Sequence, residues 1–232
     1  GVNKEAYFYF WDDKGSAEAP IDIRTHGGWT RTTRNKSIRI YPRKKALGGI
    51  EYDIFDDGTL LEDSRIILRN AGNAVSRDYM VDAVLQRALS DLNFGTQRYR
   101  PAVTFINGEY NGILNIRDRQ DHYYLQKLYK LPTRNVDILK NEHEVKRGDS
   151  KHWEQFLIFI EKTPPDSELF FQELEGWIDL KSYIDYHAAQ IFIANTDWPG
   201  NNIRWWRYKD KESQLSDNKN GMATSQYTDG RW

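Results

Sequence analysis

The chain has 232 residues, of which 39% are hydrophobic and 14% aromatic, and its 33 basic residues nearly balance 34 acidic ones. This is the composition of a folded globular protein and excludes a disordered or fibrous chain. A net charge of −1 gives no general attraction to nucleic acid or anionic membranes, so any phosphate binding must be local. The absence of cysteine excludes disulfides, thiolate zinc sites and cysteine nucleophiles, and no apolar run approaches the roughly 20 residues of a membrane span.

The first third of the chain predicts short strands separated by turns, because aromatic and β-branched runs are interrupted by Gly, Asp and Pro clusters. The predicted strands are residues 7–11, 21–24 and 36–41. The apolar period then changes to that of a helix over 78–89, with Ser76 or Asp78 placed to cap its start.

A β-hairpin is predicted next, because residues 103–106 and 110–116 flank Asn107-Gly108, a dipeptide that tolerates the positive φ values of a type I′ turn. Beyond residue 120 the pattern is mainly helical. The helix candidates are 120–130, 150–162 and 179–195, with short strands at 135–139 and 203–208. Asp179 is a natural N-cap for the last helix, and the polar stretch 209–230 predicts an exposed loop before a further strand.

The common catalytic motifs are absent, since the sequence has no G-x-x-x-x-G-K-[ST], G-x-G-x-x-G, G-x-S-x-G or H-E-x-x-H. The histidines at positions 26, 122, 143, 152 and 187 show no metal-ligand spacing, which argues against a zinc centre. His187 lies within the helix predicted over 179–195, and we expect it to be structural, with a neighbour satisfying its ring.

The segment after that helix places Asp197 and Asn202 five residues apart across a Pro-Gly turn. In phosphoryl transfer, an aspartate so placed orients the substrate hydroxyl or accepts its proton, while the asparagine amide oxygen binds Mg²⁺. The alternative is that both side chains satisfy backbone groups of the turn, and for this spacing alone that interpretation is favoured.

Lys36 is the second candidate, because a lysine that projects from a strand can hold the phosphates of a nucleotide. Neighbouring basic residues add positive potential to the same region. They are Arg24, Arg31, Arg34 and Arg39. Taken alone, these alternating basic residues are better explained as the solvated face of a strand.

Three carboxylates belong to the hairpin and to the helix after it. Glu109 lies in the hairpin turn, and Asp118 at its far end is a candidate partner that would fix Lys36 through an ion pair. Asp121 is better explained as a charge at a helix N-terminus.

Two further groups allow more than one role. Arg69-Asn70 with Arg77-Asp78 suit an anion site or a structural salt bridge, of which we favour the salt bridge. The pair Trp205-Trp206 suits a sugar or peptide platform, although packing within a buried strand is commoner.

In this order, the segments resemble the CotH kinase family, which is named for a spore coat protein and also occurs in secreted and surface bacterial proteins. The resemblance covers roughly residues 5–208 and rests on a small set of segments. They are Ile23–Arg31 with Lys36–Ile40, Leu68–Asp78, Phe105–Gly112 and Asn195–Asn202.

The resemblance implies an α+β, atypical protein-kinase-like fold, with a strand-rich nucleotide lobe at about 1–118 and a helical catalytic lobe at about 119–232. It implies transfer of the γ-phosphate of ATP to Ser or Thr of protein substrates, with Mg²⁺ or Mn²⁺ as the metal. It also implies an extracytoplasmic location, secreted, on the cell surface or in the spore coat, and gives no reason to expect a nucleic acid partner.

By position, the resemblance implies that Asp197 is the catalytic aspartate, Asn202 a metal ligand and Lys36 the phosphate-binding lysine. It places Arg31 and Asp118 in the cofactor site as well, although the family more often has Glu at the position of Asp118. After a tryptophan like Trp232 the family continues with a strand and a D-x-D metal aspartate, so we expect full activity to need residues beyond 232.

A second hypothesis is a non-catalytic adhesion or matrix-binding module on a kinase-like scaffold, which uses aromatic surface rather than ATP, because a fold does not settle function. Glycoside hydrolysis is a less supported third, because no pair of carboxylates can be placed across a cleft from the sequence.

Overall fold

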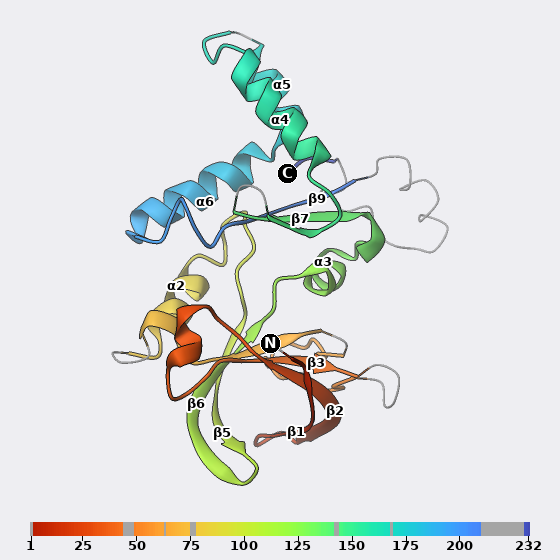
Figure 1. Ribbon diagram of the computed structural model, residues 1–232, viewed down its shortest axis with the longest axis vertical. Helices are drawn as coiled ribbons and strands as arrows, with labels where there is room; N and C mark the ends of the chain where they lie inside the picture. The colour runs from red at the N-terminus through yellow and green to blue at the C-terminus, as the bar shows by residue number, and fades with distance from the viewer. Residues whose placement is uncertain are drawn as a thin grey trace. The chain divides into compact units, whose positions relative to one another are not determined.

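The computed structural model describes residues 2–43, 49–62, 64–74, 78–141, 144–167, 169–209 and 230–232. The chain divides into two compact units, one formed by Gly1–Ser90 with Gly95–Tyr124 and the other by Asp91–Phe94 with Leu125–Trp232. The fold is mixed α and β, as the sequence predicts, with a strand-rich first unit and the longer helices in the second (Figure 1).

The first unit is built on a six-stranded sheet. Its strands are β1 (Lys4–Trp11), β2 (Ser16–Thr25), β3 (Ile38–Pro42), β4 (Ile66–Arg69), β5 (Tyr99–Ile106) and β6 (Glu109–Asp118). They lie in the order β1-β2-β3-β4-β6-β5, and every neighbouring pair is antiparallel. The first two strands are longer than the sequence predicts, β3 begins at Ile38 rather than at residue 36, and β4 has no counterpart among the predicted strands.

The hairpin expected around Asn107-Gly108 joins β5 to β6. Asn107 and Gly108 have φ values of 52° and 81°, in the left-handed region that a type I′ turn requires, so the prediction is confirmed. The register shifts between Val103 and Phe105, and this β-bulge separates the turn from the rest of the ladder.

The core of the first unit gathers the inward-facing residues of these strands. The buried cluster comprises Phe8, Phe10, Ala19, Ile21, Ile40, Ile50, Ile54, Leu61, Ile66 and Ile116. Burying each large apolar side chain contributes about 1.5–3 kcal/mol. Ile50, Ile54 and Leu61 come from the segment 49–62, which therefore belongs to the core although it contains no regular strand.

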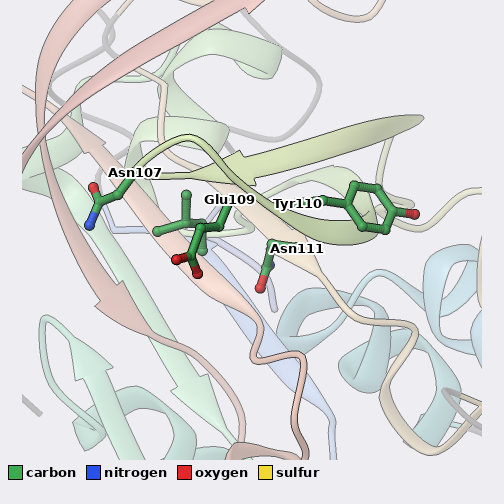
Figure 2. Close-up of a pocket in the computed structure, with 5 residues that line it drawn as sticks. Asn107, Glu109, Tyr110 and Asn111 are labelled. Carbon is green, nitrogen blue, oxygen red and sulfur yellow. The ribbon is translucent and has the colours of Figure 1, made fainter.

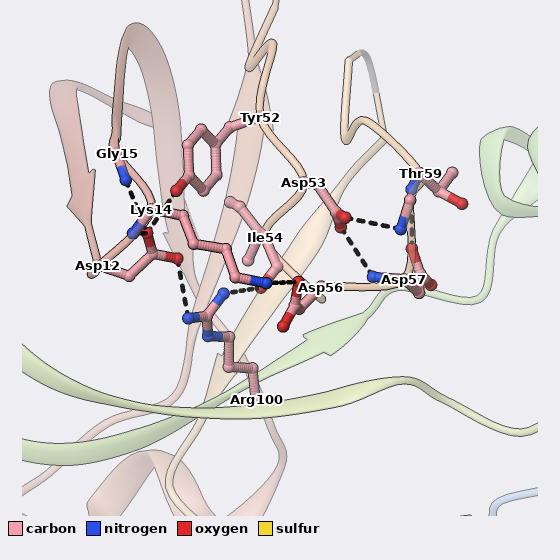
Figure 3. Close-up of polar contacts among 11 residues, drawn as sticks. Asp12, Lys14, Gly15, Tyr52, Asp53, Ile54, Asp56, Asp57, Thr59 and Arg100 are labelled. Carbon is pink, nitrogen blue, oxygen red and sulfur yellow. Dashed lines mark hydrogen bonds and ion pairs between the residues drawn. The ribbon is translucent and has the colours of Figure 1, made fainter.

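Polar contacts fasten the segment 49–62 to the β1–β2 turn and to β5 (Figure 3). Asp12 in the turn accepts hydrogen bonds from the hydroxyl of Tyr52 and from two backbone amides, and it pairs with Arg100 of β5 at 2.9 Å. These bonds, the one from Tyr52 foremost, lower the pKa of Asp12 to about 2. Arg100 also donates to the carbonyl of Ile54 at 2.8 Å, so one arginine connects three parts of the unit.

The helix expected over 78–89 is α2 (Val81–Ala88). Met80 is the N-cap residue and makes no side-chain cap, so Asp78 is not the N-cap as expected, although its Oδ1 accepts from the first amide of the helix at 3.1 Å. Ser76 lies outside the described residues. The helix expected over 120–130 is α3 (His122–Tyr129), and the boundary between the two units falls within it. Short 3-10 helices cover Trp29–Thr32 (η1), Gly72–Ala74 (η2) and Thr133–Asn135 (η3).

The second unit contains a three-stranded antiparallel sheet in the order β8-β7-β9, together with three helices. The elements are β7 (Val136–Lys140), β8 (Glu144–Arg147), α4 (Lys151–Lys162), α5 (Phe170–Trp177), α6 (Leu180–Phe192) and β9 (Arg204–Tyr208). The sequence predicts four of these, but not β8 or α5. Asp179 caps α6 as expected, because its Oδ1 accepts from the amide of Ser182 at 3.0 Å.

The core of the second unit is largely aromatic. Its buried members are Leu139, Trp153, Phe156, Phe170, Leu174, Ile178 and Trp232. Most of the loop predicted at 209–230 lies outside the described residues, and the strand predicted to follow it is not present at 230–232. In the described part of the chain, no helix combines the length and apolar character needed to cross a membrane.

Candidate functional site

The loop after α6 brings together the two side chains that the sequence singles out. Asn202 donates from Nδ2 to Oδ2 of Asp197 at 3.1 Å. The backbone amide of Asp197 bonds to Oδ1 of Asn195 at 3.1 Å, which forms an Asx turn. Asn195 is held in turn by Gln190 of α6 at 2.7 Å. The C-terminal end of α6 therefore positions the exposed carboxylate of Asp197.

Asn202 has a backbone conformation that suits its residue type. Its φ of 62° lies in the left-handed region, where asparagine is tolerated better than most other residues. The bond to Asp197 uses the amide nitrogen and leaves the amide oxygen as a candidate ligand. Amide and carboxylate oxygens are the hard donors that Mg²⁺ prefers, so the residue types of this loop fit a divalent cation. The described residues contain no group of three or more His, Cys, Asp or Glu side chains that could hold a metal on its own.

His187 and Trp198 pack together beside this loop. Their rings lie 5.2 Å apart in a T-shaped contact, and the ring of His187 lies 4.0 Å from that of Tyr183. Burial lowers the pKa of His187, so the neutral ring is favoured. This packing agrees with the structural role expected of His187. The expectation that a neighbour satisfies its ring is not met, because its Nε2 has no hydrogen-bond partner in the described part of the chain.

Lys36 does not project from a strand, which corrects the expectation. It is exposed, two residues before β3, and its Nζ donates to the carbonyl of Thr33 at 3.2 Å. The turn that carries it is held by Asn70, which is fully buried and donates to Thr33 Oγ1 at 3.0 Å and to the carbonyl of Asn35 at 2.6 Å. Ser37 donates to Oδ1 of Asn70 at 2.8 Å. Lys36 is therefore an exposed side chain on a turn whose backbone is held by Asn70.

The hairpin strand β6 lies against the same turn. Gly112 has a φ of +85°, and a Cβ at this position would lie 2.9 Å from Nδ2 of Asn35. Only glycine allows this backbone conformation and this approach without displacing Asn35. The Asn107–Gly112 hairpin and the Lys36 turn thus form one connected region of the first unit.

The basic residues near Lys36 have different environments. Arg31 in η1 is exposed, and its Nε donates to the carbonyl of Gly28 at 3.3 Å. Arg39 donates to Nδ1 of His26 at 2.7 Å. Arg24 is half-buried and Arg34 is exposed. Of these, Arg31 and Arg34 are exposed and so accessible to a ligand.

Asp118 is not brought to Lys36. Its carboxylate is almost fully buried and forms a two-pronged ion pair with Arg98 at 2.9 and 2.8 Å, while the backbone amide of Arg98 donates a further bond at 2.9 Å. In the strand register Asp118 lies level with Ile66 and so with Ile40, four residues beyond Lys36 along the strand direction, or roughly 13 Å at the rise of a β-strand. The ion pair expected between Asp118 and Lys36 is therefore wrong.

The other two carboxylates differ in exposure. Glu109 is exposed beside the hairpin turn, where Ile106, Asn107, Glu109, Tyr110 and Asn111 line an open hollow of about 310 Å³ (Figure 2). Asp121 is buried at the start of α3 and accepts from the amide of Tyr123 at 3.0 Å, which confirms its expected place at a helix N-terminus. It also pairs with Arg65 at 3.1 Å, which the sequence does not predict.

The remaining candidates have structural roles. Arg69 forms an ion pair with Asp82 of α2 at 3.1 Å, in line with the favoured salt bridge, although with a different partner; Arg77 lies outside the described residues. Trp205 packs on Trp153 at 5.3 Å and Trp206 stacks on Tyr129 at 5.0 Å. The tryptophan pair is thus packed in β9 and does not form an exposed platform.

The roles of two asparagines that hold the loops of the candidate site were not predicted from the sequence. The spacing of Asn195 and Asp197 is a signal for an Asx turn that could have been read from the sequence. Asn70 gives no such signal, because it acts on a turn that is more than thirty residues away in the chain.

A model of the CotH kinase protein family matches residues 23–216, well over half of the chain. The chain belongs to this family. A comparison with curated proteins gives no match. The region matched to the CotH kinase family contains Arg31, Lys36, Asp118, Asp197 and Asn202, so each candidate site residue lies within it. Strand β1 lies before it.

Proposed function

We propose that this protein is an ATP-dependent protein kinase that transfers the γ-phosphate of ATP to Ser or Thr residues of a protein substrate. The observation that carries the proposal is the hydrogen bond of 3.1 Å between Asp197 and Asn202, within the region that matches the CotH kinase family. A lone pair at this spacing would be explained by turn chemistry, and the family match is what favours catalysis.

In the proposed mechanism, Asp197 orients the hydroxyl of the substrate and accepts its proton, as the aspartate of a kinase catalytic loop does. The Asx turn at Asn195 fixes the backbone of Asp197 and the bond from Asn202 limits rotation of its carboxylate, so less orientation entropy is lost when the substrate binds. The amide oxygen of Asn202 would be one ligand of Mg²⁺ or Mn²⁺. When bound, the metal neutralises charge on the phosphates.

We assign nucleotide binding to the first unit and catalysis to the second, which follows the two lobes of about 1–118 and 119–232. Lys36 and Arg31 would bind phosphate oxygens, because both are exposed cations, Lys36 on the turn whose backbone is held by Asn70 and Arg31 on η1 just before that turn. Asp118 is left out of this set, since Arg98 already neutralises it. The extracytoplasmic location of the enzyme and its substrates remains part of the proposal and rests on the family.

Thermal unfolding of the protein with and without MgATP or MnATP tests nucleotide binding. At about 100 times the dissociation constant, the ligand should stabilise the protein by roughly 2.7 kcal/mol. This corresponds to several degrees at about 2–4 °C per kcal/mol for a chain of this size. Lys36→Ala and Asn202→Ala should reduce the shift, whereas Lys162→Ala, at an exposed lysine of α4, should retain it.

Phosphate transfer from radiolabelled ATP to a generic protein acceptor tests catalysis separately. Asp197→Ala should lower the rate by roughly 10²–10⁴-fold, as expected for loss of a general base, while the shift in melting temperature with MgATP persists. An unchanged rate in Asp197→Ala would contradict the assigned role. The absence of any metal-dependent shift in the unsubstituted protein would contradict nucleotide binding itself.

A further inference from the structure

Strand β1 carries a row of exposed aromatic side chains that the proposed kinase function does not use. Tyr7, Tyr9 and Trp11 are 49%, 63% and 65% exposed, whereas the alternate residues Phe8 and Phe10 are buried in the core. In a half-buried strand the solvent face normally carries polar residues. Three large rings at successive solvent-facing positions therefore cost solubility without contributing to the core of this unit.

The row is regular and continuous. Alternate residues of a strand lie roughly 6.8 Å apart, so the three residues span about 14 Å in a line. The rings of Tyr7 and Tyr9 approach to 5.0 Å between centroids, which makes neighbouring rings nearly contiguous. Strand β1 is the first strand of the six-stranded sheet, at its edge (Figure 1), and β2 is its neighbour. The row thus forms a narrow aromatic strip along one edge of the sheet.

Of the three residues that face the aromatic strip across the β1–β2 ladder, two are polar and none is basic. In the β1–β2 register, Tyr7 faces Pro20, Tyr9 faces Glu18 and Trp11 faces Ser16. Glu18 and Ser16 are exposed and offer a carboxylate and a hydroxyl beside the rings.

Lys14 in the β1–β2 turn is paired with Asp56, and Arg43 near the other end of the strip is also neutralised. Arg43 pairs with Glu5 at 2.7 Å and with Asp22 at 2.6 Å. An anionic polymer such as RNA would therefore meet carboxylates without the Lys and Arg contacts on which its binding depends.

We propose that Tyr7, Tyr9 and Trp11 bind a neutral polysaccharide chain. Pyranose rings have apolar C–H faces that stack on aromatic rings, and their hydroxyl groups form hydrogen bonds with phenol, indole and carboxylate groups at the edges. A linear strip suits a linear chain of sugars rather than a single ring. The strip lies before residues 23–216, so it is separate in sequence from the region that contains the proposed kinase site residues.

Native electrophoresis in gels that contain a soluble neutral polysaccharide tests the proposal. The probes are hydroxyethyl cellulose, xylan and galactomannan, with poly(U) as the anionic comparison. At least one neutral polysaccharide should retard the unsubstituted protein. Trp11→Ala should weaken binding roughly tenfold, Tyr9→Ala with Trp11→Ala should abolish the retardation, and Trp11→Tyr should keep most of it.

Tyr110→Ala is the matched control, because Tyr110 is 67% exposed on the other hairpin of the same unit and should not affect retardation. Since the substituted side chains are largely exposed, melting temperatures should stay within a degree or two of the unsubstituted protein. The proposal is overturned if none of the neutral polysaccharides retards the protein, or if the double variant is retarded equally. Retardation by poly(U) alone, or a dimer in size-exclusion chromatography that the double variant loses, would also overturn it.

Discussion

Two asparagines hold the loops that carry the candidate site residues. Asn195 fixes the backbone before Asp197 through an Asx turn, within two residues of its target. Asn70 fixes the turn that carries Lys36, and it does so from the position just after β4, with no exposed surface. A buried amide that makes several hydrogen bonds contributes more by preventing unsatisfied groups than by the bonds themselves. Asn70 is therefore the residue on which the shape of the Lys36 turn depends most.

Asn70→Ala should destabilise the protein by about 2–3 kcal/mol, because it leaves Ser37 Oγ and the carbonyl of Asn35 without their buried partner. Urea denaturation measures the change. Asn111→Ala, at the rim of the hairpin hollow, is the control and should stay within about 0.5 kcal/mol. Equal stabilities of Asn70→Ala and Asn111→Ala would show that the Lys36 turn does not depend on Asn70.

Among the elements, those with a strong local signal are predictable from the sequence. The hairpin has Asn107-Gly108, and α6 has an apolar stripe with Asp179 at its cap. Helix α5 begins after Leu169 with no side-chain cap, and β8 is mostly exposed, so neither has such a signal. Elements of this kind depend on tertiary packing, here the burial of Phe170 and Leu174 in the second core.

The ion-pair partner of Asp118 could not be predicted from the sequence, because a β-bulge changes the register of the hairpin. Counting outward from the turn, where Ile106 pairs with Glu109, would place Asp118 opposite Gln97. The β-bulge between Val103 and Phe105 shifts the register by one residue, and Arg98 becomes the partner instead. A register can be derived from a turn, but a bulge in the middle of the ladder is set by packing.

Gly148 is required by the shape of the segment between β8 and α4. Its φ is +69°, and a Cβ there would overlap the buried carboxylate of Asp137. Gly148→Ala should therefore cost at least about 1–2 kcal/mol from the backbone alone, and more from displacing Asp137. Gly176→Ala in α5, where a Cβ meets nothing within 4 Å, should instead stabilise the protein by up to about 1 kcal/mol. Guanidinium denaturation measures the free energy of unfolding of both variants. If both are destabilised or both are stabilised, the roles assigned to the two glycines are wrong.

At the scale of the whole molecule, the candidate site also has parts that local sequence determines and parts that long-range contacts determine. Asp197 and Asn202 lie five residues apart in one loop, so the sequence singles out both, and the structure joins them by a hydrogen bond of 3.1 Å. The placement of Lys36 depends on Asn70 and on Gly112 from distant strands, and the sequence therefore misplaced it on a strand and paired it with Asp118. Local motifs identify the residues of such a site, whereas long-range contacts decide which of them come together.

Global stability should depend on pH through His152. Its Nδ1 accepts from Nε1 of Trp232 at 2.9 Å, and this bond joins the start of α4 to residue 232. Burial, aided by the charge of Arg207, lowers the pKa of His152 to about 4 from an ordinary value of 6.5. Between pH 6.5 and pH 4, His152 is protonated in the unfolded chain but stays neutral in the folded one. The free energy of unfolding is therefore unaffected by His152 above pH 6.5 and decreases as the pH falls toward 4.

The free energy of unfolding should decrease by an amount on the order of 1 kcal/mol over this pH range. This is less than the pKa difference alone would give, because the His152 ring is partly exposed to solvent. His152→Gln keeps an acceptor for Trp232 but cannot be protonated, so its melting temperature should fall less steeply between pH 6.5 and 4.5. Some slope should remain, since burial also lowers the pKa of His187. The carboxylates with lowered pKa values, such as Asp12 at about 2, titrate mainly below this range and do not confuse the comparison. If the melting temperatures of the unsubstituted protein and of His152→Gln fall equally steeply between pH 6.5 and 4.5, His152 is not the group responsible.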